Sequence, residues 1–177
     1  MRNVILYIAT SIDGYIADID GGVSWLEGDG SDQKAEGTYM QFIQNIDSVV
    51  MGYKTYKQIL EELSPNQWPY EGLHTYVITH REIPSSTNVS FTKDSPSALI
   101  AKLKEQEGKD IWICGGASIV NQLLEAKLID KLIITSAPTI LGRGKRLFEE
   151  VDFQTKLSLE SSVNYNGFVE SSYTIKK

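Results

Sequence analysis

The residues best suited to bind a ligand lie between positions 110 and 126, where an apolar strand, a glycine pair and an amphipathic helix follow one another. Gly115 and Gly116 come directly after the apolar run 111–114, and the helix must begin near Ala117 or Ser118. Two glycines at a strand end let the backbone turn sharply and approach a ligand with no Cβ atom in the way. The first N–H groups of the helix then face outward, where the helix dipole favours negative charge. The pattern predicts a phosphate seat for a nucleotide or dinucleotide, although its spacing is not that of a Rossmann turn and the pair could instead pack a strand against a helix.

The segments that must position this turn alternate between strand and helix patterns. Apolar runs of strand length occur at 4–9, 48–51, 75–79, 89–91, 111–114 and 131–137, and helical patterns occur at 33–46, 55–63, 96–107 and from 117 onward. Ser31 or Asp32 can cap the first helix, and Ser95 or Asp94 the third. This alternation is typical of a mostly parallel sheet with helices on both faces.

The C-terminal segment has a different pattern. Two strand-like stretches, 155–163 and 168–175, flank a turn that ends in Asn166-Gly167, a strong hairpin signal. Val169, Tyr173 and Ile175 alternate with polar residues, so we expect that face to be the buried one. The fold prediction is therefore an α/β domain with a C-terminal antiparallel hairpin, spanning residues 1–177 as a single domain.

Composition restricts the classes of partner. The chain has 177 residues, a net charge of −6 and a pI near 5.0, which argues against non-specific nucleic-acid binding. Cys114 is the single cysteine, so no intrachain disulfide can form, and its apolar neighbours predict a buried side chain rather than a nucleophile. The apolar run 4–9 is too short to span a membrane and lacks a cleavage pattern. We expect a cytoplasmic protein.

Two loops stand out by composition. The segment from Asp13 to Gly30 is rich in glycine and aspartate and contains one large apolar anchor, Trp25. A loop of this length in a compact domain is usually functional. The second loop, 141–148, carries Arg143, Lys145 and Arg146, which could attract a phosphorylated substrate or could lie in water while the loop supports the first one.

Taken in order, the motifs at 11–17 (SIDGYIA), 51–56 (MGYKTY), 115–116 (GG) and 141–148 (LGRGKRLF) resemble the dihydrofolate reductase-like superfamily. The resemblance covers nearly the whole chain and is closest to the reductase domain of the bacterial riboflavin-biosynthesis deaminase–reductase. It implies that NADPH binds across the carboxyl ends of the strands and that hydride passes to a small heterocycle. It also implies a homodimer.

The resemblance assigns cofactor-binding roles to residues at three strand ends. Gly115, Gly116, Ala117, Ser118 and Ile119 should pass beneath the pyrophosphate. The turn of Gly52, Lys54 and Thr55 should meet the cofactor phosphates, although Tyr53 stands where the family usually has arginine. Thr79 and Arg81 close the third strand, where Arg81 could pair with the 2′-phosphate or could simply be solvated.

Two acidic residues are candidates for catalysis. A gapless match to folate reductases places Glu36 on their helix-borne carboxylate, on the helix face of Tyr39, Met40 and Ile43. A partly buried carboxylate there could deliver a proton, but an exposed helix glutamate is the alternative. The resemblance places Asp13 where the first strand opens towards the nicotinamide; the alternative is a simple Asp-Gly turn.

The leading hypothesis is an NADPH-dependent oxidoreductase acting on a pterin- or pyrimidine-like substrate. Folate itself is disfavoured because segment 68–74 contains no arginine for its glutamate carboxylate. The zinc pattern of the deaminases is absent, so that activity is excluded and no metal is expected. The alternative is a non-catalytic nucleotide-binding or regulatory module on the same fold.

Overall fold

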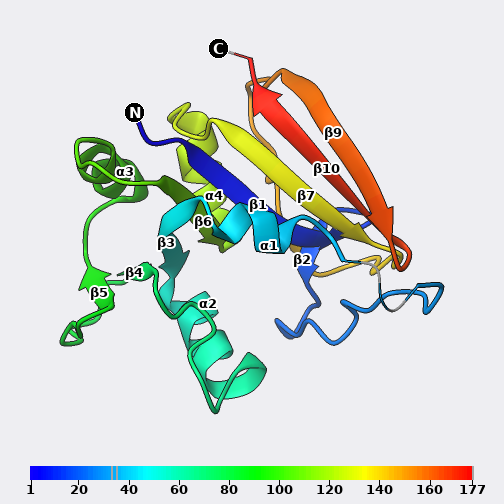
Figure 1. Cartoon of the computed structure of the whole chain (residues 1–177), viewed down its shortest axis with the longest axis horizontal. Coiled ribbons are helices and arrows are strands. Elements are labelled where there is room, and N and C mark those ends of the chain that lie inside the picture. The colour runs from blue at the N-terminus through cyan, green and yellow to red at the C-terminus, as the bar shows by residue number, and fades with distance from the viewer. Residues whose placement is uncertain (33, 35, 177) are drawn as a thin grey trace.

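The computed structural model describes residues 1–32, 34 and 36–176, and its core is an eight-stranded sheet with the order β5-β4-β3-β6-β1-β7-β10-β9 (Figure 1). The strands are β1 (Val4–Ser11), β3 (Ile46–Gly52), β4 (His74–Ile78), β5 (Val89–Thr92), β6 (Asp110–Gly115), β7 (Lys131–Ala137), β9 (Leu157–Tyr165) and β10 (Phe168–Ile175). All neighbouring pairs are parallel except β10 with β7 and β9 with β10. The predicted mostly parallel sheet with a C-terminal hairpin is therefore confirmed.

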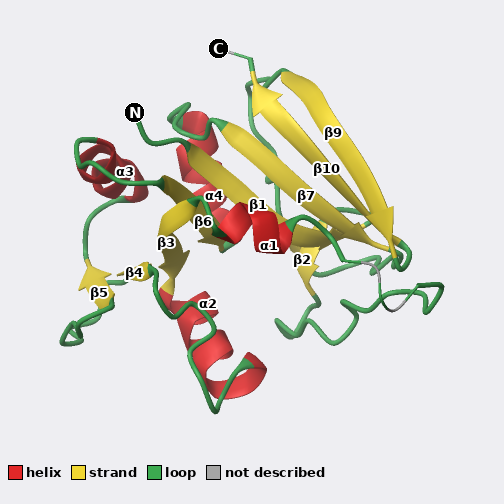
Figure 2. Cartoon of the chain, in the orientation of Figure 1, coloured by secondary structure: helices red, strands yellow, loops and turns green. Residues whose placement is uncertain are grey.

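Helices cover both faces of one half of the sheet (Figure 2). They are α1 (Tyr39–Ile43), α2 (Tyr53–Gln58) with the π-helix η1 (Ile59–Leu63), α3 (Pro96–Lys104) and α4 (Ala117–Glu125). Leu103 of α3 and Leu123 of α4 pack in one core cluster, whereas Phe42 of α1 and Ile59 of η1 pack in a second one. Since β1, β3 and β6 contribute side chains to both clusters, these central strands are buried on both faces. In Figure 2, β7, β10 and β9 lie open in this view.

The amino ends of the central strands are tied together by Arg2, which is 5% exposed. Its guanidinium pairs with Asp47 and donates to Ser48 Oγ at 2.7 Å. It also donates to the backbone carbonyls of Lys109 at 2.6 Å and Leu103 at 3.2 Å. These bonds satisfy a buried charge far from the carboxyl ends of the strands, so we assign Arg2 to stability rather than to ligand binding.

The helix predicted over 33–46 is wrong in extent, because α1 begins only at Tyr39. Residues 33 and 35 lie outside the described residues, and Glu36 is exposed and precedes the helix. Two features oppose an earlier start. Gly37 is a poor helix former, and the Thr38 N–H donates to Glu170 Oε1 at 3.1 Å rather than to an upstream carbonyl. Asp32 accepts from Lys34 N at 3.2 Å, which closes a local turn and not a helix cap.

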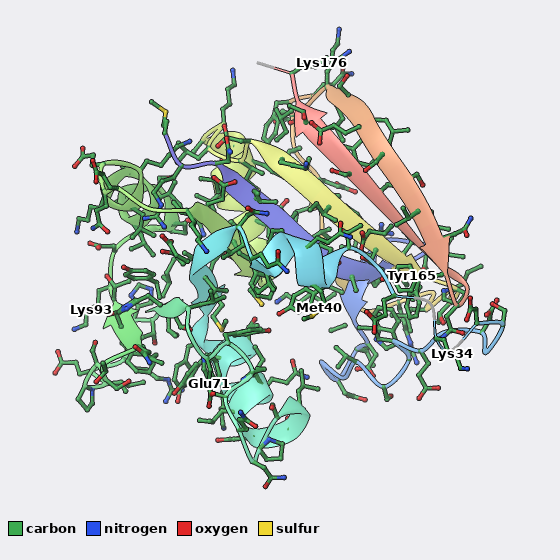
Figure 3. All side chains as sticks on the ribbon, in the orientation of Figure 1. Lys34, Met40, Glu71, Lys93, Tyr165 and Lys176 are labelled. Atoms are coloured by element: carbon green, nitrogen blue, oxygen red, sulfur yellow. The ribbon has the colours of Figure 1, made fainter. Side chains whose placement is uncertain are left out.

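The long glycine-rich loop is more ordered than its composition suggests. It contains β2 (Tyr15–Ala17), which pairs antiparallel with β8 (Lys145–Arg146). This confirms that the 141–148 loop supports the first loop, and Lys145 and Arg146 are exposed. The loop also reaches the hairpin turn, where Asp29 N donates to Asn166 O at 3.0 Å. Figure 3 shows Tyr165 at this end of β9, beside the loop.

Candidate functional site

Two glycine-capped helix starts meet at the carboxyl ends of β3 and β6. Gly52 is the N-cap of α2 and Gly116 is the N-cap of α4, and neither cap uses a side-chain hydrogen bond. β3 and β6 are neighbours, with Met51 opposite Gly115. The two helices lead to opposite faces of the sheet, which makes the region between these strand ends, called the crevice below, equivalent to the topological switch point of other open α/β sheets.

Distances from each N-cap glycine to the first turn of the other helix show how closely the two helix starts approach. A Cβ atom on Gly116 would lie 3.8 Å from Thr55 Oγ1, and one on Gly52 would lie 3.5 Å from Ile119 Cδ1. Gly115 has a φ of +130°, a conformation that an L-residue rarely adopts. The structure therefore brings the predicted residues Gly52, Thr55, Gly116 and Ile119 together in one place.

Arg81 reaches the same region from the end of β4. Its guanidinium carbon lies 4.8 Å from the centre of the Tyr53 ring, a cation–π contact at the first residue of α2. Thr79, which is buried, accepts from Arg81 N at 3.1 Å and fixes the exit of the strand. A cation thus lies over the position where Tyr53 replaces the family's usual arginine. Lys54 and Ser118 are exposed on the first turns of their helices.

An aromatic pocket of about 380 Å³ lies next to this crevice on the α1 side of the sheet. Its lining comes from β1, the long loop, α1, the segment before β4, β6, β7 and the hairpin: Tyr7, Ile8, Ala9, Leu26, Tyr39, Tyr70, Trp112, Thr135, Tyr165 and Phe168. A Cβ atom on Gly115 would lie 3.5 Å from Ile8 Cδ1, so the glycine turn adjoins the pocket. Flat aromatic walls with few polar groups suit a planar ring. Sequence reasoning did not find this pocket, because its residues come from seven separate segments.

Cys114 lies behind the pocket wall. Its sulfur is 3.7 Å from the Tyr70 hydroxyl oxygen. Burial raises the pKa of the Cys114 thiol to about 11, so it stays protonated at neutral pH. A protonated thiol agrees with the prediction that Cys114 is not a nucleophile, although the residue is only partly buried.

Asp13 binds backbone and not the aromatic pocket. Its carboxylate accepts from Ser11 Oγ at 2.7 Å, from Leu141 N at 3.0 Å and from Gly142 N at 2.7 Å. The Ser11 hydrogen bond, with help from the two backbone donors, lowers the pKa of Asp13 to about 2. A carboxyl group with this pKa carries almost no proton at neutral pH, so the geometry favours a role in joining the two loops.

The buried acidic side chain on this side of the sheet is Glu170 and not Glu36. Glu36, expected on a helix at the pocket edge, is exposed and is not among the residues that line the pocket. Glu170 is 3% exposed and is the one buried acidic residue in the part of the chain that the structure describes. Glu170 could not be predicted from the sequence, because it lies on the polar face of β10, opposite the face of Val169, Tyr173 and Ile175 that is expected to be buried.

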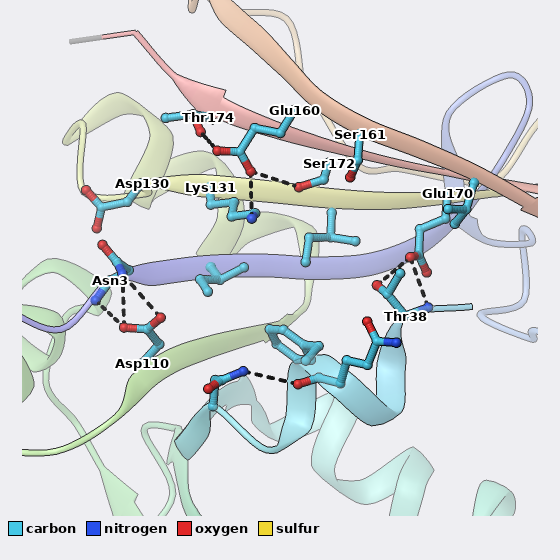
Figure 4. Close-up of a pocket in the computed structure, with 16 residues that line it drawn as sticks. Asn3, Thr38, Asp110, Asp130, Lys131, Glu160, Ser161, Glu170, Ser172 and Thr174 are labelled. Carbon is cyan, nitrogen blue, oxygen red and sulfur yellow. Dashed lines mark hydrogen bonds and ion pairs between the residues drawn. The ribbon is translucent and has the colours of Figure 1, made fainter. Parts of the chain in front are cut away.

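A second cavity, an open groove of about 500 Å³, lies over β7, β10 and β9 on the face of the sheet that α1 covers (Figure 4). Figure 4 shows Glu160 bonded to Lys131 and Ser172, and Glu170 bonded to Thr38. Within the described ranges, no three His, Cys, Asp or Glu side chains are arranged to hold a metal ion. No described helix is both long and apolar enough to cross a membrane.

Comparisons with known proteins bear on both sequence and fold. The family model of the RibD C-terminal domain matches residues 2–169. The uncharacterized protein YwjB of Bacillus subtilis (strain 168) is 36% identical over 173 residues, covering 97% of this chain and 97% of that protein.

Two solved structures are similar in fold. A putative riboflavin biosynthesis protein from Shewanella sp. PV-4 has a TM-score of 0.86 and 26% identity, covering 99% of this chain and 100% of that one. The diaminohydroxyphosphoribosylaminopyrimidine deaminase/5-amino-6-(5-phosphoribosylamino)uracil reductase of Thermotoga maritima has a TM-score of 0.69 and 16% identity, and the match covers 99% of this chain and 57% of that one. The second likeness shows the fold alone. The match of the family model over nearly the whole chain shows that this chain belongs to the RibD C-terminal domain family.

Proposed function

We propose that this protein is an NADPH-dependent reductase of a small pterin- or pyrimidine-like heterocycle. One observation carries the proposal: two glycine-capped helix starts meet directly beside an aromatic pocket. Membership in a reductase family supports the same reaction class.

The residues of the crevice fit a dinucleotide. The space above Gly116 is free of close atoms, since the nearest atom to a Cβ there would be 3.8 Å away. The backbone N–H groups at the starts of α2 and α4 would hold phosphate oxygens, assisted by Lys54, Thr55 and Ser118. Arg81 would pair with the 2′-phosphate that distinguishes NADPH from NADH. Bound NADPH would supply a hydride, and the aromatic walls would orient the acceptor ring and exclude water from it.

The test is a titration followed by tryptophan fluorescence, because Trp112 lines the pocket. We expect NADPH to bind the parent, and Gly116→Val to abolish binding by filling the space beneath the phosphates. Gly116→Ala is a milder variant, since its φ of −79° is open to any residue. Ala101→Val introduces the same valine side chain on an exposed site of α3, adding two methyl groups, and serves as the control. Unchanged NADPH affinity in Gly116→Val would show that the cofactor phosphates bind elsewhere.

A second candidate is a nucleotide-binding module without catalysis. Two observations favour it: Glu36 is exposed, and Asp13 is held ionised by backbone donors. A screen of pterins and pyrimidines with oxidation of NADPH as readout separates the two functions. Binding of NADPH without turnover on any of these substrates would support the module.

We further propose a homodimer that forms through β9. This nine-residue strand is the outer edge of the sheet, and its side chains are exposed except at the last residue. Leu157 is 41% exposed, Leu159 61% and Val163 39%. An exposed edge with apolar side chains and free backbone groups favours pairing with another strand. Antiparallel pairing centred on Ser161 would place Leu159 opposite the partner's Val163, without opposing like charges.

A further inference from the structure

The group that remains without an assigned role is the buried carboxylate of Glu170 on β10. Its Oε2 accepts from the Tyr7 hydroxyl at 2.6 Å and from Thr135 Oγ1 at 3.2 Å. Its Oε1 accepts from Thr38 N at 3.1 Å and Thr38 Oγ1 at 2.5 Å. Burial of a charge is costly unless such bonds replace those to water, and these four donors do so.

Among the residues that the structure describes, the ion pairs of lysine and arginine all go to other carboxylates, and none goes to Glu170. A carboxylate can only accept, so Glu170 sets the direction of the hydroxyl hydrogens of Tyr7, Thr135 and Thr38. Burial, and then the bond to Glu170, raise the pKa of Tyr7, so the phenol keeps its proton throughout the useful pH range.

Glu170 lies where the two cavities adjoin. It lines the open groove, whereas its partners Tyr7 and Thr135 line the aromatic pocket (Figure 4 shows the groove side). The Tyr7 ring stacks on Tyr39 at 5.8 Å and meets Phe42 edge-on at 4.7 Å, which fixes the ring plane. With its ring packed and its hydrogen bound to Glu170, the Tyr7 hydroxyl has one orientation. Only oxygen lone pairs are left for a ligand that reaches it.

We propose that Glu170 is a positioning residue that turns the Tyr7 proton away from the aromatic pocket, so that the pocket selects planar rings whose edge donates N–H groups. A ring edge that carries only acceptors would meet the lone pairs of Tyr7 and would leave both groups unpaired, which is costly in a dry site. Glu170 lies one residue beyond the stretch that the family model matches. The inference rests on the proposed function in one respect, namely that this pocket holds the substrate.

The test compares two rings of nearly equal shape. 4-Aminoquinazoline carries N–H donors on its edge, and 4-methoxyquinazoline carries none. We expect the parent to bind the amino compound about 10-fold more tightly, the effect of one hydrogen bond to a polarised acceptor. Binding is measured by tryptophan fluorescence and by calorimetry, with and without NADPH.

Two variants change the hydrogen bond between Tyr7 and Glu170, one at each partner. Tyr7→Phe deletes the oxygen, and Glu170→Gln offers an amide that can donate to Tyr7 and free its proton for the pocket. In both, the preference should fall below about threefold. Glu160→Gln is the matched control, because Glu160 lies on the neighbouring strand, pairs with Lys131 and lines the groove but not the pocket. It should keep the parent's preference.

Equal binding of the two rings by the parent, or a parent-like preference in either Tyr7→Phe or Glu170→Gln, would overturn the inference. So would failure of both rings to bind. If Glu170→Gln does not fold, as judged by thermal melting, Tyr7→Phe decides. NADPH titrated into the same samples tests the proposed function separately, since its binding site does not include Tyr7 or Glu170. Binding of NADPH without ring selection would reject this inference alone.

Discussion

Selection of NADPH over NADH should depend on a two-residue arrangement, Arg81 lying over the ring of Tyr53. The guanidinium carbon is 4.8 Å from the ring centre, which holds the charge at the first turn of α2. A charge-assisted hydrogen bond to phosphate contributes about 1.5–3 kcal/mol, and the exposure of Arg81 favours the lower value. Arg81→Ala should therefore weaken NADPH binding about 10-fold and leave NADH binding nearly unchanged.

Variants of Tyr53 separate the contribution of its aromatic ring from that of the Arg81 charge. An exposed cation–π contact is worth about 0.5–1 kcal/mol, so Tyr53→Ala should weaken NADPH binding about two- to fivefold. Tyr53→Phe keeps the ring and should bind like the parent. Lys57→Ala removes a positive charge one turn further along α2 and controls for net charge.

The assay is a pair of fluorescence titrations, one with NADPH and one with NADH, on each variant at the same ionic strength. An unchanged ratio of the two dissociation constants in Arg81→Ala would refute the reasoning. A loss in Tyr53→Phe equal to that in Tyr53→Ala would show that the Tyr53 hydroxyl, and not the ring, makes the contact.

Three further predictions follow from other parts of the molecule. Because hydrogen bonds lower the pKa of Asp13 to about 2, the stabilising effect of its carboxylate is present above the usual carboxyl pKa and is lost as pH falls towards 2. The difference in melting temperature between the parent and Asp13→Asn should therefore shrink between pH 5 and pH 2. A constant difference would contradict this prediction. Arg2→Met should lower the free energy of unfolding, measured in urea, by about 3 kcal/mol. Lys102→Met breaks the exposed ion pair with Asp94 and should lower it by less than about 1 kcal/mol. Equal losses would count against a stabilising role of the buried Arg2 hydrogen bonds. Leu159→Lys should give a monomer in light scattering at micromolar concentration while Ile140→Lys, on an exposed loop, stays dimeric; a monomeric parent would reject the dimer.

The parts of the fold that the sequence predicts well are those with local causes. The strand at 4–9 extends to Ser11, and Ser95 caps α3 by accepting from Ala98 N, as predicted. The hairpin turn at Asn166-Gly167 is also local, because both residues adopt positive φ angles of 46° and 79°. Each of these features depends on a few neighbouring residues whose preferences agree.

The features that the sequence does not predict depend on contacts between distant segments. Glu170 is buried because Thr38, 132 residues earlier, brings its N–H and hydroxyl to the same face of the sheet. The expected buried side of β10 is wrong in part, since Val169 is 46% exposed. The same bond to Glu170 is one of the two features that oppose an earlier start of α1, so the error in the helix and the missed carboxylate are connected.

The hairpin that carries Glu170 also contributes to the candidate site. Tyr165, Phe168 and Glu170 come from a stretch of six residues at the turn of β9 and β10, and they supply two walls of the aromatic pocket and the group that orients Tyr7. The long loop is bound to that turn as well, since Gly30 N donates to Asn166 Oδ1 at 2.9 Å. In the proposed function, the strand ends of the parallel sheet would bind the cofactor, whereas the hairpin and the loop would shape the space for the substrate. Differences in the hairpin are therefore expected to change substrate choice while the cofactor crevice stays the same.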